Sequence, residues 1–106
     1  MKGNTVKPIQ VGIWGLGRAG WGMHCQELGQ FPDKFQIVAG CDIEADRLKL
    51  FKERYPDADV WQDGAAFLAD PRIELIAVAV RSPQHVDYAL RALAAGKMVF
   101  LEKPIA

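Results

Sequence analysis

The sequence lacks the features that mark several classes of protein. Its 106 residues carry 13 basic and 13 acidic side chains, so the net charge is zero and no long-range field favours nucleic acid or an anionic membrane. The longest unbroken apolar run, Leu75 to Val80, is far shorter than the roughly 20 residues that span a bilayer. The segment Met1 to Pro8 is polar and lacks the apolar stretch of a secretory signal. We therefore expect a cytoplasmic protein that binds small molecules and other protein, without nucleic acid or membrane.

Cysteine is also scarce. The two cysteines, Cys25 and Cys41, have neither metal-ligand nor redox spacing. Without a secretory signal, free buried thiols are expected rather than a disulfide. No metal site and no sulfur chemistry are predicted.

Short apolar runs bounded by turn residues are typical of strands that are buried on both faces. They span Ile9 to Trp14, Phe35 to Cys41, Leu75 to Val80 and Met98 to Leu101, with a brief strand near Ala58 to Trp61. Helices are expected between them, at Arg18 to Gln30, Glu44 to Arg54, Gly64 to Ala69 and before Gly96. This alternation predicts an α/β fold, a Rossmann-type doubly wound parallel sheet of order 3-2-1-4-5. Half of the residues are hydrophobic, enough for one core, so residues 1–106 are expected to form a single domain.

The helix before Gly96 has marked ends. Ser82 suits the N-cap, Pro83 the first helical position, and Gly96 the left-handed position after the last turn. Its apolar residues recur with the spacing of an amphipathic helix. They are Val86, Ala89, Leu90, Leu93 and Ala94.

A glycine-rich segment follows the first strand directly and opens the first helix. It reads Gly15-Leu16-Gly17-Arg18-Ala19-Gly20. Gly15 would allow the tight turn, Gly17 the approach of a pyrophosphate, and Gly20 the close packing of helix and strand. The anion would rest on the N–H groups of the helix N-terminus. Alone, the pattern is equally compatible with glycines that only make a flexible turn, and Arg18 is either a phosphate ligand or a solvated side chain.

Asp42 supplies the second half of the dinucleotide fingerprint. It ends the second strand, near the spacing of about 20 residues at which an acid binds the adenosine ribose. The alternative is that it caps the following helix, and the two roles are compatible. A 2′-phosphate would meet this carboxylate, and Ile43 beside it offers no positive charge, so NAD is predicted over NADP. Arg47, one turn into the helix, is a possible compensating group.

The last third of the chain carries a family resemblance. It contains Ser82-Pro83-Gln84-His85, and then Ala-Gly-Lys at 95–97 and Glu102-Lys103-Pro104 on either side of the last strand. These motifs resemble the N-terminal domain of the glucose-fructose oxidoreductase and inositol dehydrogenase family, over nearly the whole chain from Ile9 to Ala106. The resemblance implies an NAD(P)-dependent oxidoreductase in which Lys103 takes part in proton transfer beside the nicotinamide. It also implies a supporting role for His85 and a position for Glu102 next to the cofactor.

Two departures from the family pattern limit what the resemblance implies. The family commonly has Thr-Pro or Asn-Pro four residues before the histidine, whereas Val80 and Arg81 stand here. The cofactor contacts expected at the turn of Val80, Arg81 and Ser82 are therefore less defined. The chain also stops two residues after Pro104, before the second domain that binds the substrate in the family.

Two functions follow as hypotheses. The first is the cofactor domain of a dehydrogenase that transfers hydride between nicotinamide and a sugar, polyol or related hydroxy compound, with this chain alone inactive. The second is a stand-alone NAD-binding sensor or interaction module, which would not need Lys103. A homo-oligomer joined through the apolar last strand, Met98 to Leu101, is expected in either case.

Overall fold

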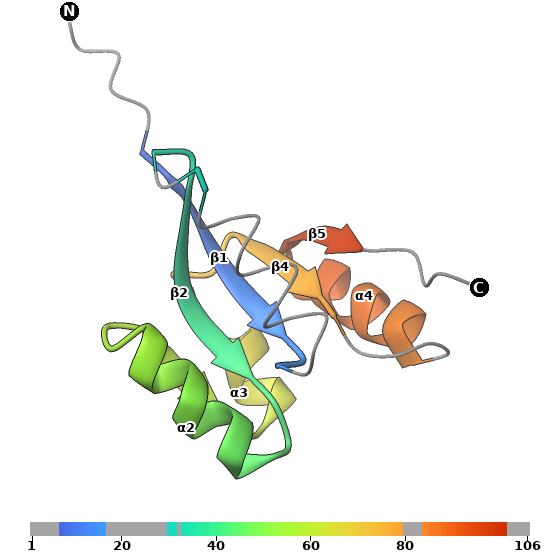
Figure 1. Ribbon diagram of the computed structural model, residues 1–106. Helices are drawn as coiled ribbons and strands as arrows, with labels where there is room; N and C mark the ends of the chain where they lie inside the picture. The colour runs from blue at the N-terminus through green and yellow to red at the C-terminus, as the bar shows by residue number, and fades with distance from the viewer. Residues whose placement is uncertain (1–6, 17–29, 32, 80–83, 102–106) are drawn as a thin grey trace, which may run out of the picture.

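The fold is known from a computed structural model of the chain, which describes residues 7–16, 30–31, 33–79 and 84–101 (Figure 1). The elements come in the order β1 (Ile9–Trp14), β2 (Phe35–Cys41), α2 (Ala45–Arg54), β3 (Asp59–Trp61), α3 (Gly64–Leu68), β4 (Leu75–Val78), α4 (Gln84–Ala94) and β5 (Met98–Leu101). None of the helices in these ranges has the length and apolar character that a membrane crossing requires.

The described strands form one parallel sheet of order β3-β2-β1-β4-β5. This order confirms the prediction. β1 lies at the centre, where Ile9 pairs with Phe35 of β2 and Val11 pairs with Leu75 of β4. Because all the strands are parallel, their carboxyl ends lie at one edge of the sheet, where α/β proteins bind their ligands.

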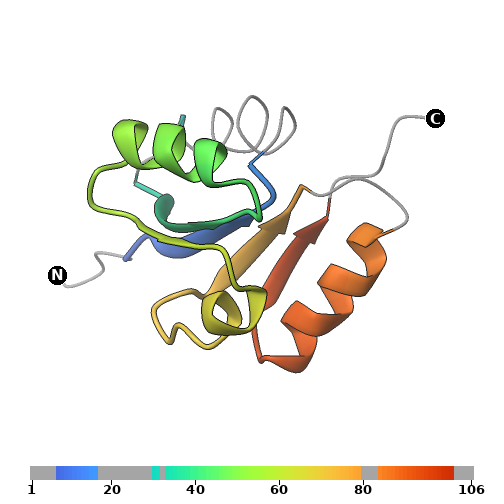
Figure 2. The same cartoon turned by 90° about the horizontal axis from the view of Figure 1, so that it is seen from below.

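Helices cover both faces of the sheet (Figure 2). α2 packs on one face, where Phe51 and Leu48 join Val11 and Ile13 in a buried cluster. α3 and α4 pack on the other face, around Phe67 and the alanines of α4. The alternating side chains of β1 therefore enter two separate cores, which is why its buried part, from Val11 to Trp14, has no polar side chain.

A glycine in β2 allows α2 to approach the sheet closely. A Cβ atom built on Gly40 would lie 2.7 Å from Cε2 of Phe51, whose side chain is fully buried. Any larger residue at position 40 must displace this ring. The glycine therefore fixes the depth at which α2 sits on the sheet.

The ends of several elements differ from the sequence expectations by one or two residues. β3 begins at Asp59 rather than Ala58, because the Ala58 N–H donates to the Tyr55 carbonyl in the preceding turn. α2 begins after Glu44 and α3 ends before Ala69, since both residues are caps. β4 is described as a strand only to Val78, whereas the apolar run continues to Val80.

Only part of the apolar face of α4 is buried. Ala89 and Ala92 are buried, whereas Val86, Leu90 and Leu93 are each more than half exposed. The small alanines mark where the helix meets the sheet, and the apolar stripe is wider than this contact. Periodicity thus predicted the helix correctly but not which of its apolar residues are covered.

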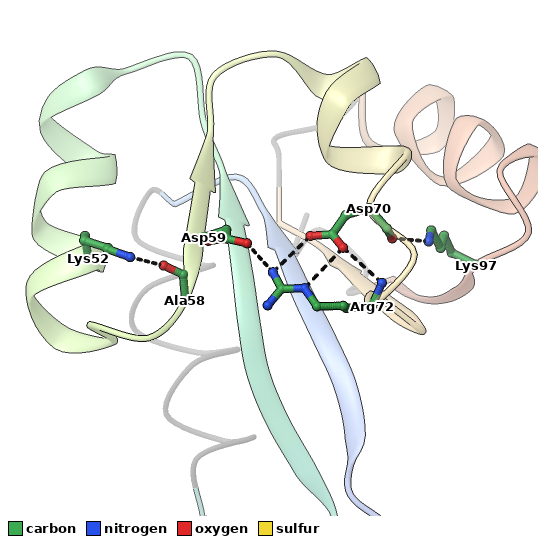
Figure 3. Close-up of polar contacts among 6 residues, drawn as sticks. All are labelled: Lys52, Ala58, Asp59, Asp70, Arg72 and Lys97. Atoms are coloured by element: carbon green, nitrogen blue, oxygen red, sulfur yellow. Dashed lines mark hydrogen bonds and ion pairs between the residues drawn. The ribbon is translucent and has the colours of Figure 1, made fainter.

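A polar network ties the sheet together at the amino ends of the strands (Figure 3). The Asp70 carboxylate accepts hydrogen bonds from the backbone N–H of Arg72 at 3.0 Å and from its guanidinium at 3.1 and 3.3 Å. Arg72 also pairs with Asp59 at the start of β3, and Lys97, directly before β5, donates to the Asp70 carbonyl at 2.7 Å. The loop before β4 is therefore bound to strands on both sides of it.

Candidate dinucleotide site at the carboxyl edge of the sheet

The turn that leaves β1 requires glycine. Gly15 has a φ of 97°, a conformation that residues with a Cβ atom rarely adopt. Its N–H donates to the Cys41 carbonyl at 2.8 Å, so the turn is fastened to the end of β2. This confirms the tight turn predicted for Gly15.

Asp42 lies directly after β2 and is the most constrained polar residue of this edge. It is 6% exposed, and its Oδ2 accepts a hydrogen bond of 2.7 Å from the N–H of Leu16 in the glycine segment. Its Oδ1 accepts one of 2.8 Å from the Glu44 N–H. Short bonds from N–H groups to a carboxylate are among the stronger hydrogen bonds in proteins. The carboxylate is therefore fixed in place and also holds the glycine segment against β2.

The alternative prediction, that Asp42 is the N-cap of the next helix, is wrong. The N-cap of α2 is Glu44, and it makes no side-chain capping bond. Asp42 stands two residues earlier and bonds the N–H of the N-cap residue itself. It shapes the entry to the helix, while its main long-range contact is Leu16.

Arg47 approaches the same carboxylate from the first turn of α2. Its Nη1 lies 3.5 Å from Asp42 Oδ2, and its side chain is 51% exposed. This distance is well beyond the usual 2.9 to 3.0 Å of an N–H···O bond. The ion pair is therefore loose, in contrast to the two backbone bonds of Asp42.

Ile43 and Gln62 complete the described part of the edge. Ile43 is 81% exposed, the most exposed large apolar side chain in the described ranges. The Gln62 side-chain amide donates to the Ile43 carbonyl at 3.2 Å, which ties the loop after β2 to the loop after β3. Sequence reasoning missed Gln62, and its one available signal was its place directly after a parallel strand.

Trp14, the last residue of β1, packs between α3 and α4 near this edge of the sheet. Its ring stacks on Tyr88 of α4 with centroids 4.5 Å apart, and the Arg91 guanidinium lies 5.2 Å from its centroid. On the α3 side, a Cβ atom on Gly64 would lie 2.7 Å from the ring. Trp14 is therefore a core aromatic residue, and it links α3 and α4 close to the glycine turn.

Cys41 is a buried free thiol, as expected. Burial, reinforced by the negative charge of Asp42, raises its pKa to about 12. The thiol is thus protonated at neutral pH and is a poor nucleophile. Within the described ranges, no group of three His, Cys, Asp or Glu side chains is placed to hold a metal ion.

The remaining predicted site residues are not placed. Gly17, Arg18, Ala19 and Gly20 lie outside the described residues, as do Val80, Arg81, Ser82, Glu102 and Lys103. His85 is the second residue of α4, and only its backbone is described. The structure thus brings together Gly15, Leu16, Asp42 and Ile43, and the contacts of the others stay predictions.

A fingerprint turn held by an acid after β2, at the carboxyl edge of a parallel sheet, defines a nucleotide-binding domain of the Rossmann class. The family described as an oxidoreductase family with an NAD-binding Rossmann fold matches residues 9–106. The chain therefore belongs to the glucose-fructose oxidoreductase and inositol dehydrogenase family, as its NAD-binding domain. The family is one of oxidoreductases, and solved relatives hold NADH or NADP.

Individual relatives agree with this assignment. The chain is 35% identical to the inositol 2-dehydrogenase of Acidothermus cellulolyticus over 102 residues, which cover 96% of the chain and 30% of that protein. The WlbA dehydrogenase from Bordetella pertussis, solved with NADH and UDP-GlcNAcA, has a TM-score of 0.84 and 26% identity, over 93% of this chain and 30% of that one. KijD10, a 3-ketoreductase from Actinomadura kijaniata solved with NADP, has a TM-score of 0.82 and 30% identity over 92% and 29%. The chain thus spans less than a third of the length of these relatives.

Proposed function

We propose that residues 1–106 form a single dinucleotide-binding domain that serves an oxidoreductase acting on a sugar, polyol or related hydroxy compound. The observation that carries the proposal is the bond between the Asp42 carboxylate and the Leu16 N–H. This bond holds the acid proposed to bind the ribose next to the turn proposed to bind the pyrophosphate, and a dinucleotide needs both groups side by side. The inositol dehydrogenases among the relatives support the substrate class.

The described residues fit a dinucleotide. A carboxylate has about four lone-pair sites, and Asp42 uses three of them, for Leu16, Glu44 and Arg47. Counting only bonds from the described residues, one site, on Oδ1, is left for a ribose hydroxyl. Ile43 offers an exposed apolar surface for the adenine beside it.

Asp42 also supports a preference for NAD over NADP. A 2′-phosphate about 4 Å from the carboxylate would cost on the order of 4 kcal/mol at an effective dielectric of 20. Solvent screening down to about 1.4 kcal/mol would still leave a tenfold bias. The two backbone bonds strengthen this argument because they prevent the carboxylate from turning away.

Lys103 is the proposed catalytic residue, on the strength of the Glu102-Lys103-Pro104 motif. The nicotinamide, when bound, supplies hydride transfer. An alcohol that loses hydride must also lose a proton, and Lys103 would hold the reacting oxygen and accept that proton. A positioned group of this kind contributes about 100- to 10,000-fold to the rate.

Calorimetric titration of the full chain with NADH and NADPH tests the cofactor assignment. We expect NADH to bind at least about tenfold more tightly. Asp42→Ser should narrow this gap if charge repulsion causes it, whereas Asp46→Ser, which removes a neighbouring charge from the first turn of α2, should change it much less. Equal or tighter binding of NADPH to the unaltered chain would contradict the preference.

Self-association is a separate proposal. β5 pairs with β4 alone among the described strands, and Met98 and Phe100 on it are both substantially exposed. Exposed apolar side chains on a strand at the end of the described sheet favour association with a second copy. Phe100→Lys should lower the apparent mass in a light-scattering concentration series without changing NADH binding. A wild-type chain that stays monomeric at millimolar concentration would refute the proposal.

A cytoplasmic location remains a prediction from the sequence. So does the alternative function, a non-catalytic NAD-binding module. The length of the relatives favours the dehydrogenase, because their remaining two thirds is available for a substrate domain.

A further inference from the structure

We propose that Arg47 is a second determinant of cofactor choice, a mobile cation that admits the 2′-phosphate of NADP beside the fixed carboxylate of Asp42. The inference rests on the proposed dinucleotide-binding function and concerns the same site. Because of Arg47, the Asp42 carboxylate would weaken the binding of NADP without preventing it.

The two side chains differ in how firmly they are held. Asp42 is buried and accepts two short backbone hydrogen bonds, so its charge stays in place whichever cofactor enters. Arg47 touches it only at 3.5 Å and has half of its side chain in solvent. A guanidinium on a flexible side chain can leave such a contact at little cost.

The placement of Arg47 suits an anion on the ribose. It lies in the first turn of α2, within reach of the carboxylate that would bind the ribose hydroxyls. Arginine pairs with phosphate through parallel N–H···O bonds, and this geometry makes it the preferred partner of such groups. Turning toward a 2′-phosphate would exchange one long contact for a stronger pair.

The same movement would assist NAD in a different way. Asp42 Oδ2 carries both the Leu16 N–H and the Arg47 contact, so its lone-pair sites are filled. If Arg47 departs, Oδ2 regains one acceptor site. Asp42 could then accept both ribose hydroxyls, one on each oxygen.

Other charges near the site oppose the phosphate. Glu44 and Asp46 both precede Arg47 at the start of α2 and are exposed, so solvent screens their charges. The buried and fixed carboxylate of Asp42 opposes the phosphate most strongly. Arg47 is therefore expected to lessen the preference for NAD without reversing it.

Adenosine 2′,5′-bisphosphate and 5′-AMP are suitable probes because they differ by the 2′-phosphate and do not involve the nicotinamide. Titration of the full chain should show that Arg47→Met weakens binding of the bisphosphate by about fivefold, the upper end of the range for a half-exposed pair, and changes binding of 5′-AMP by less than about twofold. Lys49→Met is the matched control, since it removes the same charge from the exposed surface of α2 and should alter neither probe. Arg47→Lys should restore part of the lost affinity.

A double-mutant cycle isolates the role of Arg47. Asp42→Ser should improve binding of the bisphosphate more in the presence of Arg47 than in the Arg47→Met background. Equal effects of Arg47→Met on both probes, or no effect on either, would overturn the inference while leaving the dinucleotide site intact. Failure of the unaltered chain to bind NADH and 5′-AMP would instead overturn the proposed function.

Discussion

Replacing Asp70 with Asn tests whether the network at the amino ends of the strands stabilises the fold. The Asp70 side chain is 6% exposed and accepts three hydrogen bonds from Arg72. Asparagine keeps one oxygen for the backbone N–H but loses the negative charge. Hydrogen bonds to a charged partner contribute about 1 kcal/mol more than neutral ones. Because Arg72 is partly solvated, we expect a total loss of about 1 kcal/mol in the free energy of unfolding, or roughly 4–8 °C in Tm.

The pH dependence distinguishes this charge effect from a packing defect. Hydrogen bonding to the Arg72 guanidinium lowers the pKa of Asp70 below its ordinary value. A carboxylate with a lowered folded-state pKa stabilises the fold fully above its unfolded pKa of about 3.9, and the contribution is lost as the pH falls through the folded pKa. The difference in stability between the wild-type chain and Asp70→Asn should therefore be largest at neutral pH and shrink in acid.

Urea unfolding followed by circular dichroism, near pH 7 and near pH 3, measures both free energies. Asp57→Asn is the control, because it removes the same charge from an exposed turn. Arg72→Met combined with Asp70→Asn should be less destabilising than the sum of the two single changes. A stability difference that is the same at both pH values, or absent at neutral pH, would refute the role of the charge.

Three other outcomes are expected. Gly40→Ala should destabilise the chain by about 1–3 kcal/mol in the same unfolding assay, because the new methyl group meets the buried ring of Phe51, and an unchanged midpoint would contradict this. Cys41 should react with a thiol reagent only as fast as the chain unfolds, since burial raises its pKa, so rapid labelling in native buffer would count against it. The purified 106-residue chain should show no NADH production from a polyol panel, because it spans only 30% of the inositol 2-dehydrogenase that it matches and a catalytic lysine depends on groups that position the substrate, and steady turnover would disprove this.

Much of the fold was predictable because it depends on local patterns. The bounds of β5 were predicted correctly, since an apolar run follows Gly96, whose φ of 83° ends α4 as expected. The strand order followed from the alternation of strands and helices and the known hand of their connections. The bounds of β5 depend on residues close to it in the chain, and the strand order depends on the succession of strands and helices.

Contacts between distant residues were not predictable in the same way. The bond from Leu16 to Asp42 and the ion pair of Arg72 with Asp59 join side chains and loops that meet only when the sheet has formed. The coverage of α4 depends on where the helix crosses β4 and β5, which its own periodicity does not contain. The sequence thus predicted Asp42 as a ligand for ribose. It did not predict that the same carboxylate accepts a hydrogen bond from the glycine segment.

The central position of β1 has a consequence for synthesis on the ribosome. Its pairing with β2 closes the shorter of its two loops, from Ile9 to Phe35, whereas its pairing with β4 closes a loop more than twice as long, from Val11 to Leu75. Shorter loops close at lower entropic cost, so β1, β2 and β3 can assemble while the rest of the chain is still being translated. At about 5–20 residues per second, one edge of β1 then stays open to solvent for on the order of seconds. During that interval the backbone N–H and C=O groups along this edge of β1 have no strand partner, and β4 satisfies them only when it is added.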